Sequence, residues 1–489
     1  MRVRLGRAGL IAALLMGAGQ AQAQRVADNA VKSADDAFGT AVGNERTGLY
    51  DPFNARGFSP VDAGNVRIEG LYFDQQTQLN GRVSRGNTVR VGISAQSYAF
   101  PAPTGVADFN LRLPGDKAIT SYMIGAGTFD SFVTELDVQT PVNEKLSVGA
   151  GVAFIRYDNQ DASKNIEWNA GALFRLRPSD AGEVSGFASM LEGCHYEQQM
   201  SIFPGGAWEP PRIKRHTFYG QGWTTSDCRQ SNGGVLGRWS FGDDWSLRAG
   251  VFRSENIMKK AFGDFMRNVQ PDGTGQHFIQ ASPRAAFTSY SGEVRLTKVV
   301  TQGDFRHTLD MSLRGRDVNR IFGGAHTIPL GPGRIGVQTW LPEPTFTFNP
   351  QTTNETQQAA LGVSYLAQWA QHGALTLGLQ KVDYRRDTFA PALPRARAEA
   401  KPWLYNAALN VFVTPQLAAY ASYTRGLEET GTAPDSALNR GEAMPTAITR
   451  QVDAGLRYTL KPGLNVVAGI FEVKKPYFTL DRNTIYLNL

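Results

Sequence analysis

The segment Val235-Leu236-Gly237-Arg238-Trp239-Ser240-Phe241 places apolar and polar side chains in near alternation, and Gly242-Asp243-Asp244 follows it with residues typical of a tight turn. After this turn the alternation resumes, because Trp245, Leu247, Ala249 and Val251 are separated by serine, arginine and glycine. Successive side chains of a strand point to opposite faces, so the pattern predicts a β-hairpin with one apolar and one polar face. A single hairpin of this kind fits both a soluble sandwich and a membrane barrel.

The same two-faced pattern recurs along most of the chain. Leu309, Met311 and Leu313 alternate with threonine, aspartate and serine, and the segment from Val452 to Leu460 alternates apolar residues with charged or small ones. We predict sixteen strands, at residues 118–128, 130–141, 145–158, 164–177, 183–193, 233–241, 245–254, 288–299, 305–316, 357–369, 374–387, 402–413, 416–426, 447–460, 463–475 and 483–489.

The connectors between these strands alternate between short and long. Every second connector has two to five residues, whereas the others are long, polar and rich in glycine and proline, above all residues 194–232, 255–287, 317–356, 388–401 and 427–446. Six aromatic residues flank the short connectors: Trp239, Phe241, Trp245, Phe305, Trp369 and Phe412. Short turns at one rim, long loops at the other and an aromatic girdle are typical of a bacterial outer-membrane barrel. The sequence therefore predicts an all-β fold with an antiparallel transmembrane β-barrel.

The first residues read as a targeting segment. Arg2, Arg4 and Arg7 precede an apolar run from Ala8 to Ala18, and Ala21-Gln22-Ala23 has the small-x-small form of a cleavage site. We interpret residues 1–23 as a secretory signal peptide. Because no later stretch has the roughly 18 continuous apolar residues of a spanning helix, strands must provide any membrane crossing.

Composition and motifs argue against several classes of function. The formal net charge of +6 falls to +3 without the leader's arginines, and no basic stripe interleaved with aromatics suggests nucleic-acid binding. The chain contains no G-x-S-x-G, H-E-x-x-H or phosphate-loop motif. Its six histidines are not spaced in the way that metal ligands are. We therefore expect no catalytic residues, no metal site and no cofactor.

The two cysteines, Cys194 and Cys228, fall within the same predicted outer loop. An exported chain leaves the reducing cytoplasm, so we predict a disulfide that closes this loop. His195 beside Cys194 is the alternative start of a metal site, and the missing paired C-x-x-C spacing disfavours it.

Residues 24–117 differ from the hairpins that follow. They contain short β segments, such as Asn65 to Phe73 and Val89 to Ile93, between glycine-rich turns. Barrels of about 16 strands or more leave an aqueous lumen, and those of about 22 strands carry a plug. We predict that residues 24–117 form a plug domain inside a barrel made by residues 118–489.

Several short motifs make the chain similar to one known family. The plug resemblance is carried by Arg56-Gly57-Phe58, by Val66-Arg67-Ile68-Glu69-Gly70-Leu71 and by Pro103-Thr104-Gly105-Val106-Ala107-Asp108-Phe109. The barrel resemblance is carried by Tyr423-Thr424-Arg425-Gly426-Leu427, by Asn439-Arg440-Gly441-Glu442 with Pro445, and by Gln451 through Tyr458. In this order, over residues 38 to 489, they resemble the TonB-dependent outer-membrane receptors, particularly the siderophore receptors.

This resemblance implies active uptake by a protein that is not an enzyme. A scarce extracellular ligand, most often a ferric siderophore, would bind between the plug and the outer loops, and the TonB-ExbB-ExbD complex would supply energy for import into the periplasm. By match to the R-G-F motif, Arg56 would be a plug arginine paired with carboxylates of the barrel wall, and a solvated turn arginine is its alternative. Tyr50, Phe53, Tyr98 and Phe100 are candidate ligand-binding residues, and packing within the plug is their alternative.

The resemblance also has gaps. The family's second plug motif is represented only by the glycine of Val91-Gly92-Ile93, and residues 24–37 contain no recognisable TonB box. Sixteen predicted strands against an expected 22 or so lead us to expect that the barrel sequence is incomplete at its C-terminal end. Two other functions remain open at this stage, a passive porin-like channel and an outer-membrane enzyme with a dispersed Ser/His pair.

Overall fold

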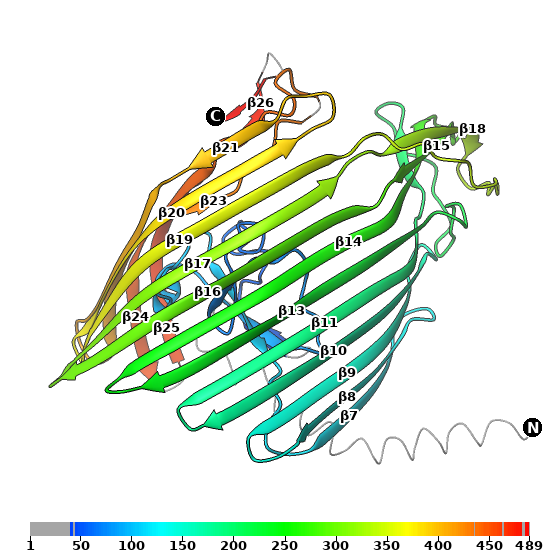
Figure 1. Cartoon of the computed structure of the whole chain (residues 1–489). Helices are drawn as coiled ribbons and strands as arrows, with labels where there is room; N and C mark the ends of the chain where they lie inside the picture. The colour runs from blue at the N-terminus through cyan, green and yellow to red at the C-terminus, as the bar shows by residue number, and fades with distance from the viewer. Residues whose placement is uncertain (1–39, 43–44, 435, 462–463, 482–484, 489) are drawn as a thin grey trace, which may run out of the picture.

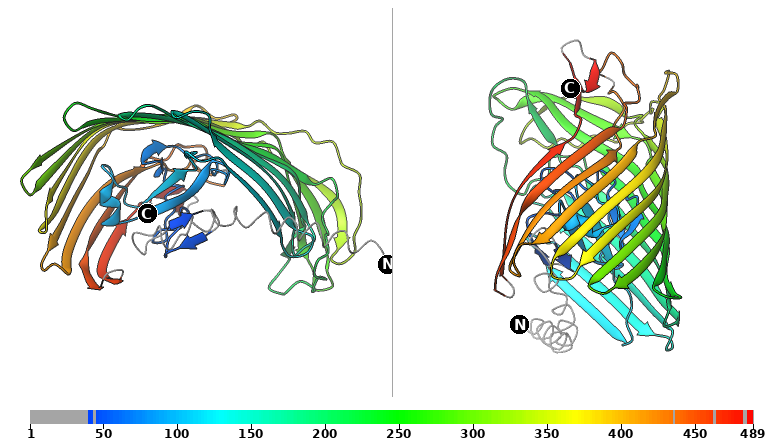
Figure 2. Two further views of the ribbon diagram at one scale, coloured as in Figure 1. Left: turned by 90° about the horizontal axis from the view of Figure 1, so that it is seen from below. Right: turned by 90° about the vertical axis from the view of Figure 1, so that its left-hand side faces the viewer.

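The computed structural model describes residues 40–42, 45–434, 436–461, 464–481 and 485–488. The predicted signal peptide lies outside these residues. Among the described residues, no helix has the length and apolar character needed to cross a membrane. The described residues form a small N-terminal sheet, a large antiparallel sheet that curves around it (Figures 1 and 2), and a two-stranded hairpin near the C-terminal end.

The N-terminal sheet forms the plug. Its strands lie in the order β2-β1-β5-β6-β3-β4, with a short 3-10 helix at Ser94–Ser97, and β3 pairs with β6 in parallel. Figure 2 shows this sheet within the concave side of the large sheet. The strand bounds are β1 (Thr40–Val42), β2 (Glu45–Thr47), β3 (Val66–Ile68), β4 (Leu71–Phe73), β5 (Ser84–Arg90) and β6 (Val106–Leu111).

The large sheet forms the barrel wall, and in the described part of the chain fifteen long strands build it. They confirm the first fifteen of the sixteen predicted strands. These strands are β7 (Ile119–Ala126), β8 (Phe132–Pro141), β9 (Leu146–Asp158), β10 (Lys164–Ser179), β11 (Gly182–Glu197), β13 (Thr225–Phe241), β14 (Trp245–Val269), β16 (Ala285–Gln302), β17 (Phe305–Phe322), β19 (Thr352–Trp369), β20 (Gly373–Phe389), β22 (Trp403–Phe412), β23 (Leu417–Glu428), β24 (Ala447–Lys461) and β25 (Leu464–Lys474).

Antiparallel ladders join these wall strands from β7 to β25. The β17–β19 ladder, for example, pairs every residue from Phe305↔Trp369 to Phe322↔Thr352. The barrel order brings β25 next to β7, and at this junction the described residues form no registered ladder. Nearly every residue of β25 is exposed on both faces of the sheet.

The prediction of a sixteenth wall strand at residues 483–489 is wrong. The chain leaves the wall after Lys474, and Pro476 lacks the backbone N–H that a continuing ladder needs. A small separate hairpin follows, formed by β26 (Phe478–Leu480) and β27 (Tyr486–Asn488). Phe478 and Tyr486 of this hairpin pack against a loop cluster of Ala433, Ala437 and Met444.

The short connectors lie at one rim, as predicted, but several predicted loops are largely strand. β14 has 25 residues, which at about 3.3 Å per residue reach roughly 80 Å, whereas about 9 to 11 tilted residues cross a bilayer. The wall therefore continues well beyond any membrane on the long-loop side. Shorter strands extend it there: β12 (Ser201–Pro204), β15 (Thr274–Ser282), β18 (His326–Arg334) and β21 (Ala396–Ala400).

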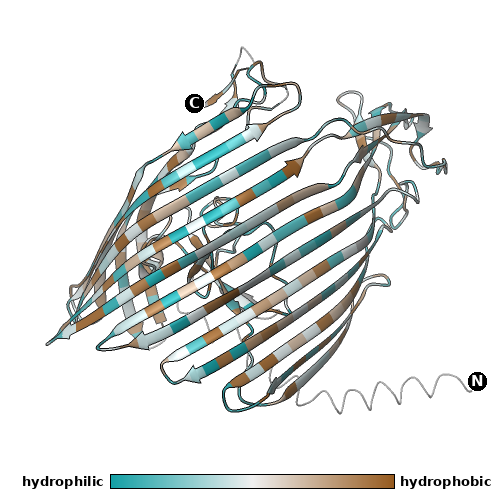
Figure 3. Ribbon diagram, viewed as in Figure 1, coloured by the Kyte–Doolittle hydropathy of each residue, from teal (hydrophilic) through white to brown (hydrophobic). Residues whose placement is uncertain are grey.

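The two faces of the wall differ as the alternation predicts, and Figure 3 shows brown and teal alternating along the strands. On β20 the outward side chains Leu375, Leu377 and Leu379 are exposed, whereas Thr376 and Gln380, at the alternate positions, are buried on the inner face. The apolar face therefore points away from the plug and the polar face toward it.

The plug docks on the inner face of the wall through one shared core. Val66, Phe73 and Val83 of the plug belong to the same buried cluster as wall residues Leu173, Phe187, Leu236 and Phe252. The rings of Phe73 and Phe252 meet edge to face, with centroids 5.7 Å apart. Because these apolar side chains of both sheets are buried in one cluster, the plug packs directly on this part of the wall.

Candidate functional site

The contact between plug and wall also carries an unusual number of buried charges. The central one is Glu293, on the inner face of β16, which is 2% exposed. It accepts hydrogen bonds from the Tyr72 backbone N–H at 2.9 Å and from the hydroxyl of Ser312 at 2.8 Å. The guanidinium of Arg295 contacts it at 2.5 Å. A plug strand and a wall strand therefore share one carboxylate.

Arg67 of plug strand β3 faces the same carboxylate. Its Nη1 lies 3.6 Å from the Glu293 carboxylate, and its Nη2 donates a 2.7 Å hydrogen bond to the carbonyl of Phe100. Burial lowers the pKa of Arg67 to about 10, so the guanidinium still carries its charge at neutral pH. A buried charge of this kind is stable only while its partner stays in place.

A second network lies farther from the short-turn rim and reaches the outer loops. Asp74, just after plug strand β4, binds Arg316 of the wall at 2.7 Å. Arg316 also binds Glu429 at 3.1 Å, and Arg320 binds Glu429 at 3.0 Å. Glu429 is the first residue after β23, so one arginine connects the plug to the base of an outer loop.

The acidic groups of this second network are held ionised by their arginines. Burial acts to raise the pKa of Asp74, but Arg316, Ser289 and Arg320 together outweigh burial and the pKa lies below its usual value. The same balance holds for Glu429, where burial is outweighed by Arg316, Arg320 and Arg386, and its pKa is also lowered. Arg386 in addition donates to the carbonyls of Thr430 and Gly431, the next loop residues.

Arg56, the arginine of the R-G-F motif, lies at the plug–wall boundary. It donates to both carboxylate oxygens of Asp453 on β24, at 2.6 and 3.2 Å. Its guanidinium also stands 4.0 Å from the ring centre of Phe471 on β25. Gly92 lies against the same aspartate with a φ of +56°, and a Cβ there would stand 2.5 Å from Asp453 Oδ2. The plug approaches the wall so closely here that only glycine fits.

A further plug arginine, Arg82, anchors the plug to another wall strand, β8. It binds Asp137 at 2.5 Å and Glu135 at 2.8 Å, both on β8. Sequence reasoning singled out neither Arg82 nor the charges around Glu293 and Arg316. The available signal was weak, because acidic and basic residues at lumen-facing positions of β8, β16 and β17 look like ordinary lumen polarity.

The four candidate ligand-binding residues do not form one site. Tyr50 packs against the plug core. Phe53 is 45% exposed. Tyr98 donates a 2.9 Å hydrogen bond to Asp108 within the plug. Phe100 is buried and its ring lies where a Cβ on wall residue Gly362 would collide. Ligand contact by these residues stays a prediction.

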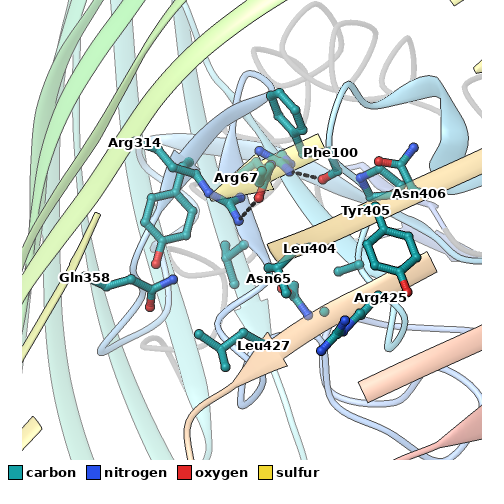
Figure 4. A pocket seen from close by; sticks show the side chains of 16 residues that line it. Asn65, Arg67, Phe100, Arg314, Gln358, Leu404, Tyr405, Asn406, Arg425 and Leu427 are labelled. Atoms are coloured by element: carbon teal, nitrogen blue, oxygen red, sulfur yellow. Dashed lines mark hydrogen bonds between the residues drawn. The ribbon is translucent and has the colours of Figure 1, made fainter. Parts of the chain in front are cut away.

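A polar cavity lies between plug and wall beside Arg67 (Figure 4). Plug residues Asn65, Arg67 and Phe100 border it on one side. Its wall side is mostly polar and includes Arg314, Gln358, Gln380, Asn406 and Arg425. Such a lining is suited to water or to a polar group. No group of three or more His, Cys, Asp or Glu that could hold a metal ion occurs in the part of the chain described.

The cysteines lie on neighbouring wall strands, so their placement in one outer loop is wrong. β11 continues past Cys194 to Glu197, β13 begins at Thr225, and Cys228 of β13 pairs with Gly193 of β11. The continued ladder between these strands explains the difference. The side chain of Cys194 lies outside the described part of the structure, and the disulfide stays a prediction.

Comparison with solved structures shows the fold. The chain is similar to the ferric preacinetobactin receptor BauA from Acinetobacter baumannii, with a TM-score of 0.71, 18% identity and coverage of 88% of this chain and 66% of that one. It is similar to the ferripyoverdine receptor of Pseudomonas aeruginosa, with a TM-score of 0.73, 13% identity and coverage of 92% and 62%. It is also similar to the ferric-catecholate import receptor Fiu of E. coli, with a TM-score of 0.72, 13% identity and coverage of 87% of this chain and 68% of that one.

The chain thus spans about two thirds of the length of these receptors. No curated protein matches it in sequence. The sequence profile described as "TonB dependent receptor-like, beta-barrel" matches residues 197–487, more than half of the chain. This protein therefore belongs to the TonB-dependent receptors, a family of outer-membrane β-barrel receptors and transporters rather than enzymes.

Proposed function

We propose that the protein binds a ferric siderophore on the outer side of its plug and imports it into the periplasm with energy transmitted by TonB. Family membership supports a TonB-driven receptor. The structural neighbours named above are receptors for ferric preacinetobactin, ferripyoverdine and ferric catecholates, which supports iron chelates as the ligand class. Energy would come through the TonB-ExbB-ExbD complex.

The single observation that carries this proposal is the way in which the plug is held. Four plug side chains, Arg56, Arg67, Asp74 and Arg82, form ion pairs with wall residues. Buried pairs of this kind contribute little net stability, but losing one partner is costly. A plug fastened at such separate points stays closed at rest, and a directed pull can release it.

The arginines of the second network suit an anionic iron chelate. Arg316, Arg320 and Arg386 line the inner wall on the long-loop side of the plug, and among the described residues they form ion pairs with two carboxylates, Asp74 and Glu429. Catecholate and carboxylate chelates carry negative charge that a guanidinium binds in bidentate geometry. We therefore place the inner end of the ligand path at these arginines.

Uptake of radioactive iron tests the proposal. A strain without its own siderophore receptors would express the full chain and receive ⁵⁵Fe bound to a panel of catecholate, hydroxamate and carboxylate siderophores. We expect uptake of at least one chelate, and none in the same strain without TonB. Uptake that persists without TonB, together with conductance unchanged by deletion of residues 24–117, would instead support a passive porin-like channel.

A further inference from the structure

We propose that an arginine cluster on the outward face of β20 and β21 binds the phosphorylated headgroup of a lipid in the outer leaflet of the membrane. The outer basic patch consists of Arg385 of β20, Arg397 of β21 and Arg395 just before β21, which surround Asp387. Figure 1 shows β21 beside the outer end of β20, on the side of the wall away from the short turns.

Strand alternation places the patch on the lipid-facing side. Leu375, Leu377 and Leu379 of β20 are exposed on the outward face. Arg385 and Asp387 follow at the same parity, with Asp387 covered by the surrounding arginines, and Arg386 between them is buried at the opposite parity. Because successive side chains of a strand alternate between faces, the patch continues the same outward face toward the long-loop end.

A lysine and a tryptophan mark where lipid ends along this face. The ammonium of Lys381 lies 5.2 Å from the ring centre of Trp403, which is 52% exposed on neighbouring β22. Tryptophan is enriched at the membrane–water interface, and lysine extends its ammonium toward that interface. Arg385 lies four residues farther along β20, or about 13 Å at 3.3 Å per residue, which is the level of lipid headgroups.

The geometry of the patch suits a phosphate. Arg385 Nε, Arg395 Nε and Arg397 Nε donate to the same carboxylate, at 2.9, 2.8 and 2.8 Å. Three positive charges thus converge on one negative charge, and each side chain is still 41 to 42% exposed. A guanidinium has five N–H donors, so each arginine keeps donors that point to solvent. Fixed guanidinium forks with excess positive charge match phosphate oxygens.

The charged residues around the outer basic patch leave this face of the wall with a net positive charge. Lys401 pairs with Asp383 at 3.0 Å, and Arg397 lies 3.4 Å from Glu399. With Lys381, and with the exposed Glu355 that lies opposite Asp387 on β19, the face carries five cations and four carboxylates. Because the patch faces away from the lumen, a transported ligand does not meet it, whereas a membrane lipid can place its acyl chains on the leucines below and its phosphate on the arginines.

Native mass spectrometry of the full chain in detergent tests this site with lipid A, the phosphorylated glycolipid of the outer leaflet. We expect the native protein to retain bisphosphorylated lipid A at least tenfold more than its dephosphorylated form. We expect the variant R385Q/R395Q/R397Q to lose this preference. A charge-matched control at the short-turn rim, K145Q/R306Q/K461Q, should keep it.

Three results would overturn the proposal. The first is equal retention of the two lipid forms by the native protein, a comparison that requires no variant to fold. The second is full retention by a patch variant with unaltered thermal unfolding. The third is displacement of lipid A by millimolar inorganic phosphate, which would make the patch a site for free phosphate instead.

Discussion

The substitution Glu293→Gln should loosen the plug, because it keeps the shape of the side chain and removes its charge. In the native chain this carboxylate is 2% exposed. It forms ion pairs with Arg295 at 2.5 Å and Arg67 at 3.6 Å, and it accepts a hydrogen bond from the Tyr72 N–H at 2.9 Å. Removing one partner of a buried pair costs about 3 to 5 kcal/mol. At about 1.4 kcal/mol per factor of ten, the undocked plug would become roughly 100 to 4000 times more populated.

Hydrogen exchange measures this change directly. In detergent-solubilised protein, amides of β3 and β4 should exchange faster by a similar factor in E293Q, while amides of β17 and β19 in the wall should stay protected. E472Q provides the matched control, since Glu472 pairs with Lys474 at 3.2 Å but is 62% exposed, and exposed pairs contribute about 1 kcal/mol at most. Exchange of β3 in E293Q within threefold of the native rate would refute the view that this buried pair fastens the plug.

Three further predictions concern other contacts of the plug and the outer loop. The pKa values of Asp74 and Glu429 are lowered from 3.8 and 4.5, so their ion pairs stabilise the docked plug fully above these values and lose this effect as the pH falls below them. Between pH 6 and pH 3 the protection of plug amides, that is, their exchange rate relative to that of free amides at the same pH, should therefore decrease, and unchanged protection would contradict the assignment. G92A should displace Asp453 and lower the unfolding temperature, whereas G431A, with open space around it, should not. R386Q should speed proteolysis within residues 431–446, and unchanged cleavage would show that Arg386 does not hold the loop.

The wall could be predicted from sequence because each strand repeats one simple constraint. Lipid on one side and a polar lumen on the other impose a period of two, and Leu309, Met311 and Leu313 display it directly. The same rule fails beyond the membrane. The outer halves of β14 and β17 face water or protein on both sides. Residues such as Phe262 to Val269 therefore do not alternate between apolar and polar side chains, and their sequence predicts a loop instead of a strand.

The fastening of the plug could not be predicted in the same way. Only Arg56 had a motif that suggested a partner across the lumen. Glu293 and Arg295 occupy lumen-facing positions of β16, where any polar residue satisfies the alternation. Their importance comes from burial against β3 and β4, which lie more than 200 residues away in the chain. A local sequence pattern carries no information about such a long-range contact.

The positions of the four fastenings suggest how the plug is released. Arg82 is bound to β8 and Arg56 to β24, whereas Arg67 and Asp74 are bound to the neighbouring strands β16 and β17, so the anchors form three separate groups on the wall. Energetic effects of distant, unconnected contacts usually add. A force applied at the N-terminal end of the plug would therefore break the anchors one at a time. Each step would oppose the pull with a few kcal/mol, which is far less than the combined resistance of anchors broken together.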